Sequence, residues 1–473
     1  MTVVSRILNS FVFWGAWIII PVLMEILPAL GSLFLLAARR RKVHKKGEIT
    51  YFPEISILVP VYNSQDTLFR CIESINGSTY PNDAIRIFLV NNQGTDDSFS
   101  VFARCQELFP DLRMQWLSTE QGKSRALNAA LYNSQGKYII NIDSDGQLEE
   151  HALYNVIRKF EADEELNCIT GAILTDPDRI NDTDSLFLRL VRQLEFVEYA
   201  QAFLAGRSYA SETNSVYTLS GAFSAFRKSA ILDSWMYNTE TVSEDTHITF
   251  QMRYLKGQRI EVCEDALFLV DPIEGWNKLY TQRQRWQRGS LEVAHMFTAR
   301  NLKFRKALTD VNVRTLLFDH TFAFPRMIWY LAMICLQAMR YSPTVIFYSV
   351  LIIFALYILV AYFYAFSAAW FLRINRKLQS YYHRHFWCVA LLPLHNFCLF
   401  FVRFAGIINS ISTDSTWKTR NLSEEWGAFT GALREEVRKP LAIREKIYRI
   451  FNNAEETGDS GEASYGPVDG YHQ

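Results

Sequence analysis

The sequence predicts an α/β protein whose mostly parallel, doubly wound sheet is flanked by transmembrane helices. Two observations predict this fold class. Short apolar runs alternate with helical patterns from Ile55 to about Val270, within a predicted domain of residues 47–300, and this alternation is typical of strands joined by crossover helices. Long apolar stretches concentrate before Arg39 and after Leu316, and their length suits helices that cross a bilayer.

Four apolar runs in the middle of the chain predict buried parallel strands, because such strands lack the alternation of half-exposed ones. They are Ile55–Pro60, Ile85–Val90, Arg113–Leu117 and Tyr138–Ile142. Helical patterns separate them at Ser64–Ile75, Thr95–Leu108 and Lys123–Asn133. In a sheet of this kind ligands bind outside the carboxyl ends of the strands, so the residues that follow each strand are the first candidates for a site.

Composition narrows the class further. The chain has 473 residues, enough for two or three domains, and its 49% hydrophobic and 14% aromatic content is high for a soluble enzyme. Lysine plus arginine and aspartate plus glutamate number 49 each, so the charge favours no nucleic-acid partner. The seven cysteines are scattered without a CxxC pair, which predicts reduced thiols and neither a zinc site nor a disulfide framework.

The N-terminal part, residues 1–46, predicts one membrane helix followed by a basic stop. The run Phe11–Ala38 is long enough to span a bilayer core, despite two prolines and a glutamate. A cleaved signal peptide is the alternative, but the run is too long for one and lacks a small-residue cleavage pattern. The basic cluster Arg39–Lys46 should stay in the cytosol, which also places residues 47–300 there.

We expect about three interfacial or transmembrane helices in residues 301–412, and in residues 413–473 a tail that is disordered from about residue 454. The apolar stretches are Leu316–Met339, Pro343–Leu372 and His385–Ile411. A basic loop, Arg373–Arg384, should be cytosolic. Polar residues interrupt the last stretch, and at membrane depth such residues usually face a cavity, a partner or a pathway. They are Pro393, His395, Asn396 and Arg403. If this stretch spans the bilayer, the tail lies outside the cell. If it is re-entrant or interfacial, the tail stays in the cytosol.

Polar residues follow three of the predicted strands: Tyr62-Asn63, Asn91-Asn92, and Asp143-Ser144-Asp145. Two carboxylates one residue apart at a strand end suit a hard divalent cation such as Mg²⁺ or Mn²⁺, which takes one or two protein carboxylates and completes its shell with phosphates and water. A solvated turn is the alternative for this triplet alone, since aspartate is a favoured turn residue. The motifs further along the chain favour the metal site.

Three more motifs follow: Ser220-Gly221-Ala222-Phe223, Ser243-Glu244-Asp245, and Gln282-Arg283-Gln284-Arg285-Trp286. In order and spacing, the whole set resembles the processive membrane branch of the family-2 glycosyltransferases, which includes cellulose, hyaluronan, chitin and poly-N-acetylglucosamine synthases. The resemblance covers roughly Ile55 to Gly289, about half the chain. It implies a nucleotide-sugar-binding domain of the GT-A type.

The resemblance also implies roles for the carboxylates. Asp143 and Asp145 would hold the cation on the diphosphate of the donor, and Asp143 would also contact the nucleotide-sugar. Asp245 would be the general base that takes the proton of the acceptor hydroxyl, with Glu244 beside it exerting like-charge pressure. The alternative for Glu244-Asp245 is the capped first turn of a helix over Thr246–Leu255, and both roles can hold together.

Other residues match the family's donor and acceptor sites. Gly221, Gln282 and Arg285 would steady the departing diphosphate, and Trp286 would offer a face to the acceptor sugar. The arginine-rich segment, with Arg283 and Arg288, offers planar groups that bind phosphate. Alternatively it is a basic amphipathic helix at the membrane surface.

Lys123, Tyr62 and Asn63 match residues near the nucleotide, although an isolated lysine would otherwise be a surface residue. One departure from the family concerns the second strand end. Most relatives carry Asp-Asp-Gly-Ser there, whereas this chain has Asn91, Asn92, Gln93 and Gly94. An amide oxygen can still accept a hydrogen bond from a uracil N3–H, but the change removes charge.

The resemblance therefore implies a multi-pass plasma-membrane enzyme with a cytosolic catalytic domain. It would transfer a UDP-linked sugar, with inversion and a divalent metal, to a growing β-linked polysaccharide coupled to export. Its partners would be the donor, the glycan acceptor, the lipid bilayer and accessory export or assembly proteins. Two alternatives stay open: transfer of one sugar to a lipid carrier, and a degenerate, non-catalytic partner protein. A pure channel or transporter would leave the α/β domain unexplained.

Overall fold

The computed structural model describes residues 26, 29–31, 33–34, 48–298, 334–338 and 342–412. The predicted membrane segments Phe11–Ala38 and Leu316–Met339 lie largely outside these residues. The basic run Arg39–Lys46 and the tail from residue 413 lie wholly outside them.

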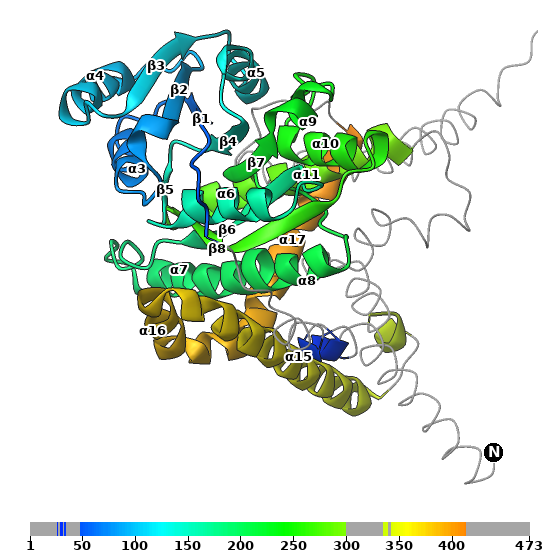
Figure 1. Ribbon diagram of the computed structural model, residues 1–473. Helices are drawn as coiled ribbons and strands as arrows, with labels where there is room; N and C mark the ends of the chain where they lie inside the picture. Colours follow the sequence, from blue (N-terminus) through cyan, green and yellow to red (C-terminus); the bar gives the residue numbers. More distant parts are fainter. Residues whose placement is uncertain are drawn as a thin grey trace, which may run out of the picture. The chain divides into compact units, whose positions relative to one another are not determined.

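An eight-stranded sheet organises the domain, in the order β3-β2-β1-β4-β7-β6-β8-β5 (Figure 1). Its first half is parallel and consists of β1 (Ile55–Val61), β2 (Ile85–Asn91), β3 (Arg113–Ser118) and β4 (Tyr138–Ile142). The helices between these strands are α3 (Leu68–Asn76), α4 (Ser98–Leu108) and α5 (Lys123–Asn133). The α/β class is thus confirmed, and each predicted strand ends within one residue of the observed one.

The prediction of a mostly parallel sheet is wrong for the second half. This half consists of β5 (Gly146–Leu148), β6 (Cys168–Thr175), β7 (Phe223–Arg227) and β8 (Ile260–Val270). β7 runs antiparallel to both β4 and β6, and β5 runs antiparallel to β8. The chain enters β7 where β4 ends, with Phe223 paired to Ile142, so the new strand has to run back along its neighbour.

The prediction that Arg113–Leu117 is buried is also wrong. β3 is the edge strand of the sheet, and none of its residues is buried. Its Trp116 packs against Phe99 and Phe102 of α4, with ring centroids 5.5 and 5.2 Å away. Those contacts explain why an edge strand carries an apolar pattern.

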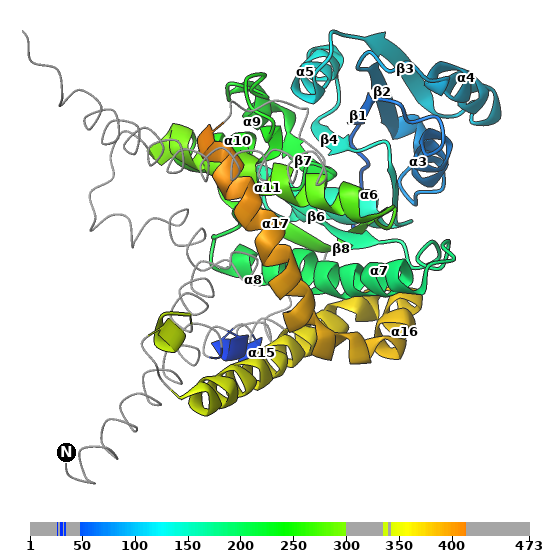
Figure 2. The same ribbon diagram turned by 180° about the vertical axis from the view of Figure 1, so that it is seen from behind.

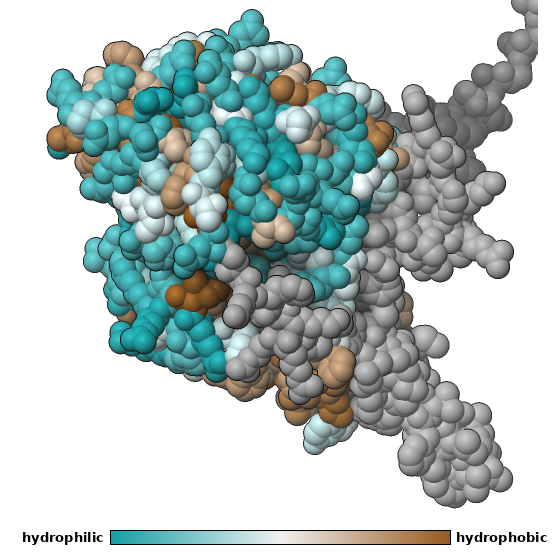
Figure 3. Space-filling view, in the orientation of Figure 1, coloured by the Kyte–Doolittle hydropathy of each residue, from teal (hydrophilic) through white to brown (hydrophobic). Residues whose placement is uncertain are grey.

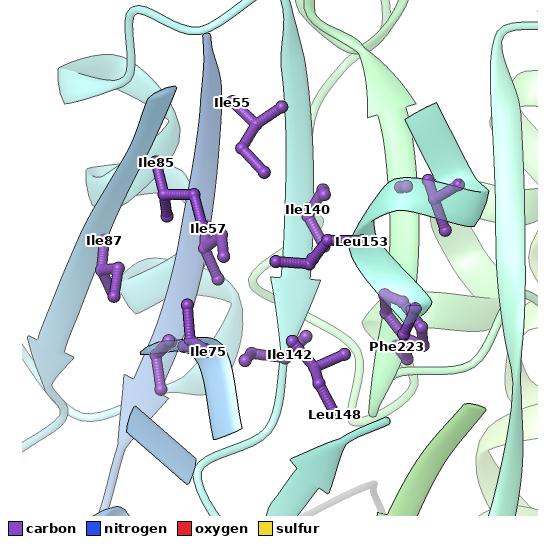
Figure 4. Close-up of a cluster of buried hydrophobic side chains, with 14 of the residues drawn as sticks. Ile55, Ile57, Ile75, Ile85, Ile87, Ile140, Ile142, Leu148, Leu153 and Phe223 are labelled. Carbon is purple, nitrogen blue, oxygen red and sulfur yellow. The ribbon is translucent and has the colours of Figure 1, made fainter. Parts of the chain in front are cut away.

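Isoleucine side chains of the parallel strands pack against the apolar face of α3 and form the core between them. Figure 4 shows the isoleucines of β1, β2 and β4 pointing toward one another and toward Leu148, Leu153 and Phe223. The buried face of α3 has the i, i+3, i+4, i+7 spacing of an amphipathic helix: Leu68, Cys71, Ile72 and Ile75. Each such isoleucine or leucine contributes about 2 kcal/mol through burial, which fixes the strand ends that carry the polar motifs.

A long helical segment covers another part of the sheet and lies between the sheet and the helices at residues 343–371 and 376–384 (Figures 1 and 2). It consists of α7 (Leu186–Tyr199), a π-helical stretch (Ala200–Gly206) and α8 (Arg207–Glu212). A second apolar core joins it to the C-terminal helices, with Phe196 and Leu204 on one side and Ala365 and Tyr382 on the other. The C-terminal helices are α15 (Pro343–Phe371), α16 (Arg376–Arg384) and α17 (Leu392–Ser412).

Two helical segments of the described residues are long and apolar enough to cross a membrane: Ile346–Ile374 and Phe386–Ala405. They coincide with the predicted stretches Pro343–Leu372 and His385–Ile411. Large apolar side chains on α15 are exposed, including Phe347 (64%) and Leu351 (53%). Figure 3 shows hydrophobic colour at the lower edge of the molecule, where α15 lies, and mostly hydrophilic colour over the sheet region.

Candidate active site

Three of the polar motifs meet because their strands are neighbours. β2, β1 and β4 are adjacent and parallel, so the residues that follow them lie along one edge of the sheet. The Ser64 and Ser144 hydroxyls lie 2.7 Å apart and link the β1 loop to the Asp143–Asp145 turn. Asn63 Oδ1 accepts a hydrogen bond from Thr95 N at 2.8 Å, which links the β1 and β2 loops.

Lys123 is the centre of this edge. Its Nζ lies 2.6 Å from Asp143 Oδ1 and 3.3 Å from Glu244 Oε1, and it donates to Gly221 O at 3.2 Å. Burial disfavours its charged form, but Asp143, Glu244 and Asp245 outweigh burial and raise the pKa of Lys123. One side chain at the start of α5 therefore contacts residues of three motifs that are far apart in sequence.

The two aspartates after β4 have the chemistry of a partial cation site. Burial of the Asp145 carboxylate and the charge of Asp143 raise the pKa of Asp145 to about 6. The described residues contain no group of three or more His, Cys, Asp or Glu side chains that could hold a metal ion. Two carboxylates still fit Mg²⁺ or Mn²⁺, because such an ion takes the rest of its shell from substrate phosphates and water.

Glu244 and Asp245 form the first turn of α10 (Glu244–Phe250), which continues as a π-helical turn over Gln251–Leu255. Asp245 Oδ1 accepts from Thr246 N at 2.6 Å, so this carboxylate does serve the helix terminus. Its Oδ2 accepts from Gly221 N at 3.1 Å, on the side of Lys123. Burial and the charge of Asp245 raise the pKa of Glu244, although Lys123 opposes them.

The Gly221 turn is held by two donors. Lys123 Nζ and Asn141 Nδ2 both donate to Gly221 O, at 3.2 and 3.0 Å. A Cβ on Gly221 would lie 3.1 Å from Asp245 Oδ2, so glycine allows the close approach. Asn141 was not among the predicted site residues. Its signal in the sequence is that it is the only polar residue in the buried strand Tyr138–Ile142.

The asparagines that replace the family's acidic pair brace the loops. Asn91 Oδ1 accepts from Gly94 N at 2.9 Å, and Asn92 Oδ1 accepts from Gly122 N. These amide oxygens therefore already accept backbone hydrogen bonds, and a nucleobase would have to use a second lone pair or the amide N–H groups. Tyr62 is half exposed at the same edge.

Helix α11 (Trp276–Thr298) carries Gln282, Arg285 and Trp286. Gln282 Oε1 is buried and has no hydrogen-bond partner among the described residues. Leaving such an atom unpaired costs free energy, and a bound ligand could satisfy it. The π-face of Trp286 lies 4.8 Å from the Arg283 guanidinium, and Phe203 packs edge-on at 5.9 Å. The indole is half buried and held from the side of α7.

Arg283 differs from the prediction for its segment. It is buried and donates from both terminal nitrogens to the Glu198 carboxylate, at 2.9 and 2.8 Å. A guanidinium engaged in this way packs α11 against α7 and does not face a diphosphate. Glu198 was not predicted, because an acidic residue on an amphipathic helix is usually exposed to solvent.

Two of the polar residues predicted in the last apolar stretch, His395 and Arg403, complete this ion cluster. His395 Nε2 lies 3.4 Å from Glu198, and the Arg403 guanidinium lies 4.0 Å from it. Burial favours the neutral acid, but Arg283, His395 and Arg403 outweigh burial and lower the pKa of Glu198 to about 2. The expected partner of these polar residues is therefore the interface of α7 and α11.

Comparison with known proteins agrees with this geometry. Residues 56–235 match the model of glycosyl transferase family 2. A poly-β-1,6-N-acetyl-D-glucosamine synthase of Staphylococcus aureus (strain MSSA476) is 26% identical over 289 residues, covering 59% of this chain and 66% of the relative. The Staphylococcus epidermidis protein of the same name is 25% identical over 277 residues, covering 58% and 64%. The matches span just under two thirds of those relatives.

Among solved structures, a mannosyltransferase from Pyrobaculum calidifontis in complex with GDP-Man and Mn²⁺ superposes with a TM-score of 0.50. It is 17% identical, and the match covers 81% of this chain and 96% of that one. This likeness concerns the fold, which is of the GT-A kind with a mixed sheet. The family match and the staphylococcal relatives together support a family-2 glycosyltransferase.

Proposed function

We propose that the protein transfers a sugar from a nucleotide-sugar to a growing β-linked polysaccharide, with inversion at the anomeric carbon. The observation that carries the proposal is the convergence on Lys123, which joins the Asp143 carboxylate to Glu244 and to the Gly221 turn beside Asp245. Donor-binding and proton-accepting groups must lie this close together for a direct transfer.

Asp143 and Asp145 would hold Mg²⁺ or Mn²⁺, which when bound neutralises charge on the departing diphosphate. Asp245 has the place of the general base. Its carboxylate accepts hydrogen bonds from Gly221 N and Thr246 N, which hold it in a fixed place beside Lys123 and the Gly221 turn. Gln282 and Arg285 of α11 would bind the diphosphate, and the orphan Gln282 Oε1 supports a ligand there, such as a sugar hydroxyl.

A polymer product is supported by the staphylococcal relatives, whose name makes UDP-N-acetylglucosamine the first donor to test. A membrane location is supported by the two apolar helical segments and by the exposed apolar side chains of α15. Lys377 of α16 pairs with Asp178 of the sheet domain, so the basic loop lies on the same side as the catalytic domain. We place this side in the cytosol of a plasma-membrane protein that acts with accessory export proteins.

The decisive experiment uses the full chain in lipid nanodiscs with a panel of nucleotide-sugars. We expect nucleotide release that needs a divalent cation and an acceptor, and a product of many sugars from one donor. If the product is a lipid carrier with a single sugar, the protein does not make a polymer and the lipid-carrier alternative is correct. Binding of nucleotide without release, for every donor, would favour the degenerate partner protein.

A further inference from the structure

Gly289 lets helix α11 touch the segment that carries Glu244 and Asp245. A Cβ built on Gly289 would fall on the hydroxyl of Ser243 and 2.7 Å from the Ser243 Cβ, a separation that real Cβ atoms essentially never show. Rotation of the serine side chain would move the hydroxyl but leave its Cβ in place. Any larger residue at position 289 therefore forces one of the two backbones to move.

Helical spacing connects this contact to the acceptor motif. Gln282, Arg285, Trp286 and Gly289 have the spacing i, i+3, i+4, i+7, so they share one side of α11. The contact at Gly289 consequently sets how far this side lies from the first turn of α10.

The Ser243 segment is braced elsewhere and cannot easily yield. Ser243 is 8% exposed, its N–H donates to Thr241 Oγ1 at 3.2 Å, and its carbonyl accepts from His247 N at 3.0 Å. Two residues later, Asp245 Oδ2 is tied to Gly221 N at 3.1 Å. A push against Ser243 would therefore be passed on to the carboxylate of Asp245 or back to α11.

We infer that Gly289 and Ser243 form the contact that sets the spacing between Asp245 and the side of α11 that carries Gln282 and Trp286. Both are positioning residues, because their effect would reach the substrate through Asp245 and Trp286. The inference rests on the proposed function, because the distance that it concerns separates the proposed base from the proposed acceptor-binding side of α11. Displacing aligned groups by about 1 Å can slow a reaction about 100-fold.

The test places Gly289→Ala in three backgrounds: wild type, Ser243→Ala and Ser243→Gly. In the wild type we expect transfer at saturating donor to fall at least about 10-fold, with nucleotide affinity unchanged. Ser243→Ala keeps the Cβ, so the loss should persist there. Ser243→Gly removes the Cβ, so the loss should shrink to about twofold or less, each variant being compared with its own Gly289 parent.

A role of Gly289 in packing alone predicts otherwise: Gly289→Ala would lower the stability of the protein, but the folded protein would transfer sugar at the wild-type rate. Unchanged transfer in Gly289→Ala, or an equal loss in all three backgrounds, would overturn the inference. If Gly289→Ala does not accumulate, Ser243→Gly must restore its accumulation and transfer together, and failure to do so counts against the contact. A wild-type protein without transfer would refute the proposed function itself, whereas an active wild type with equal losses refutes only the contact.

Discussion

Lys123 Nζ lies 2.6 Å from Asp143 Oδ1, and this ion pair joins the strand-end carboxylates to the Glu-Asp turn of α10. Glu244 lies 3.3 Å from the same ammonium, and the charges of Asp143, Glu244 and Asp245 raise the pKa of Lys123. Counting Asp145, four carboxylates face one ammonium at this edge. Such a surplus of negative charge attracts a cation and repels a free diphosphate, so the donor should enter together with its metal.

Asp143→Asn removes one carboxylate and keeps the size of the side chain. We expect turnover to fall about 100-fold or more, and Mn²⁺ to lose its effect on nucleotide binding. Nucleotide release and binding are measured while Mn²⁺ is titrated. Asp111→Asn, at an exposed aspartate before β3, is the matched control and should behave as the wild type. Full wild-type activity in excess chelator would refute the metal.

Asp245→Asn tests the base. The amide keeps an oxygen that can accept from Gly221 N or Thr246 N, but it cannot take a proton. We expect kcat to fall about 100-fold or more while donor binding persists. Asp245→Ala should lose in addition the anchor of the Gly221 turn and therefore weaken donor binding. A near-normal rate in the asparagine variant would mean that another group takes the proton.

The parallel half of the domain was predictable because its signals are local. β1, β2 and β4 are mostly apolar and buried, and the loops that follow them carry the polar motifs. The antiparallel β7 was missed because Phe223–Arg227 is short and overlaps the Ser220–Phe223 motif, so that its first residue was assigned to a site and not to a strand. Its direction depends on pairing with β4, which is a contact over more than 80 residues of sequence.

Site residues were predictable only where they belong to a sequence motif that is associated with a chemical role. Asp143, Lys123 and Asp245 were predicted from motifs. In the structure Lys123 pairs with Asp143, and both Lys123 and Asp245 hydrogen-bond to Gly221, which is consistent with a shared site. Glu198 was missed because its importance depends on burial against Arg283 and His395, which come from elements 85 and 197 residues away. Partners that are so far apart in sequence cannot be predicted from the spacing of residues along the chain.

Topology can be tested at the two ends of α15. Ser380 in α16 and Ser342 before α15 are both exposed, and they should lie on opposite sides of the bilayer. In a background without the exposed Cys335 and Cys398, an impermeant thiol reagent added to intact cells should label Ser342→Cys and spare Ser380→Cys. Cysteines placed in the basic run Arg39–Lys46 should also be spared. Labelling of either basic segment from outside would overturn the orientation.

The Glu198 ion cluster should dominate the stability of the interface between α7, α11 and α17. Glu198→Gln leaves the buried Arg283 without its counter-charge, and we expect a loss of about 3–5 kcal/mol in the free energy of unfolding. Glu107→Gln, at an exposed position of α4, is the control and should change little.

The same cluster predicts that the stability of the folded protein depends on pH in the acid range. The pKa of Glu198 is lowered from 4.5 to about 2 in the folded protein, so its contribution is fully present above pH 4.5 and is lost as the pH falls toward 2. Thermal unfolding between these pH values should show this slope in the wild type and a smaller one in Glu198→Gln. Identical slopes in the two proteins would show that Glu198 is not the group responsible.

Trp286 decides between an acceptor platform and a packing residue. Tyr199 of α7 lies 6.4 Å from its ring centroid and Phe203 of the neighbouring π-helical stretch lies 5.9 Å away, so these two elements position the indole. Arg283, one turn earlier on α11, lies 4.8 Å from the ring centroid. An aromatic ring held in this way offers its remaining surface to a sugar at little entropic cost. Trp286→Ala should therefore shorten the polymer while donor binding stays almost intact, and Trp286→Phe should fall between the two.

The packing alternative makes a different prediction for the same variant. If the indole only anchors α11, its loss should lower the amount of protein in the membrane and leave the length of the remaining product unchanged. Trp235→Ala, at a tryptophan that is 71% exposed on another element, controls for loss of an indole as such. Product length and nucleotide release are measured on membranes matched for protein. An unchanged product length at a normal protein level would show that Trp286 does not bind the acceptor. It would also remove the main argument for processive synthesis that rests on α11.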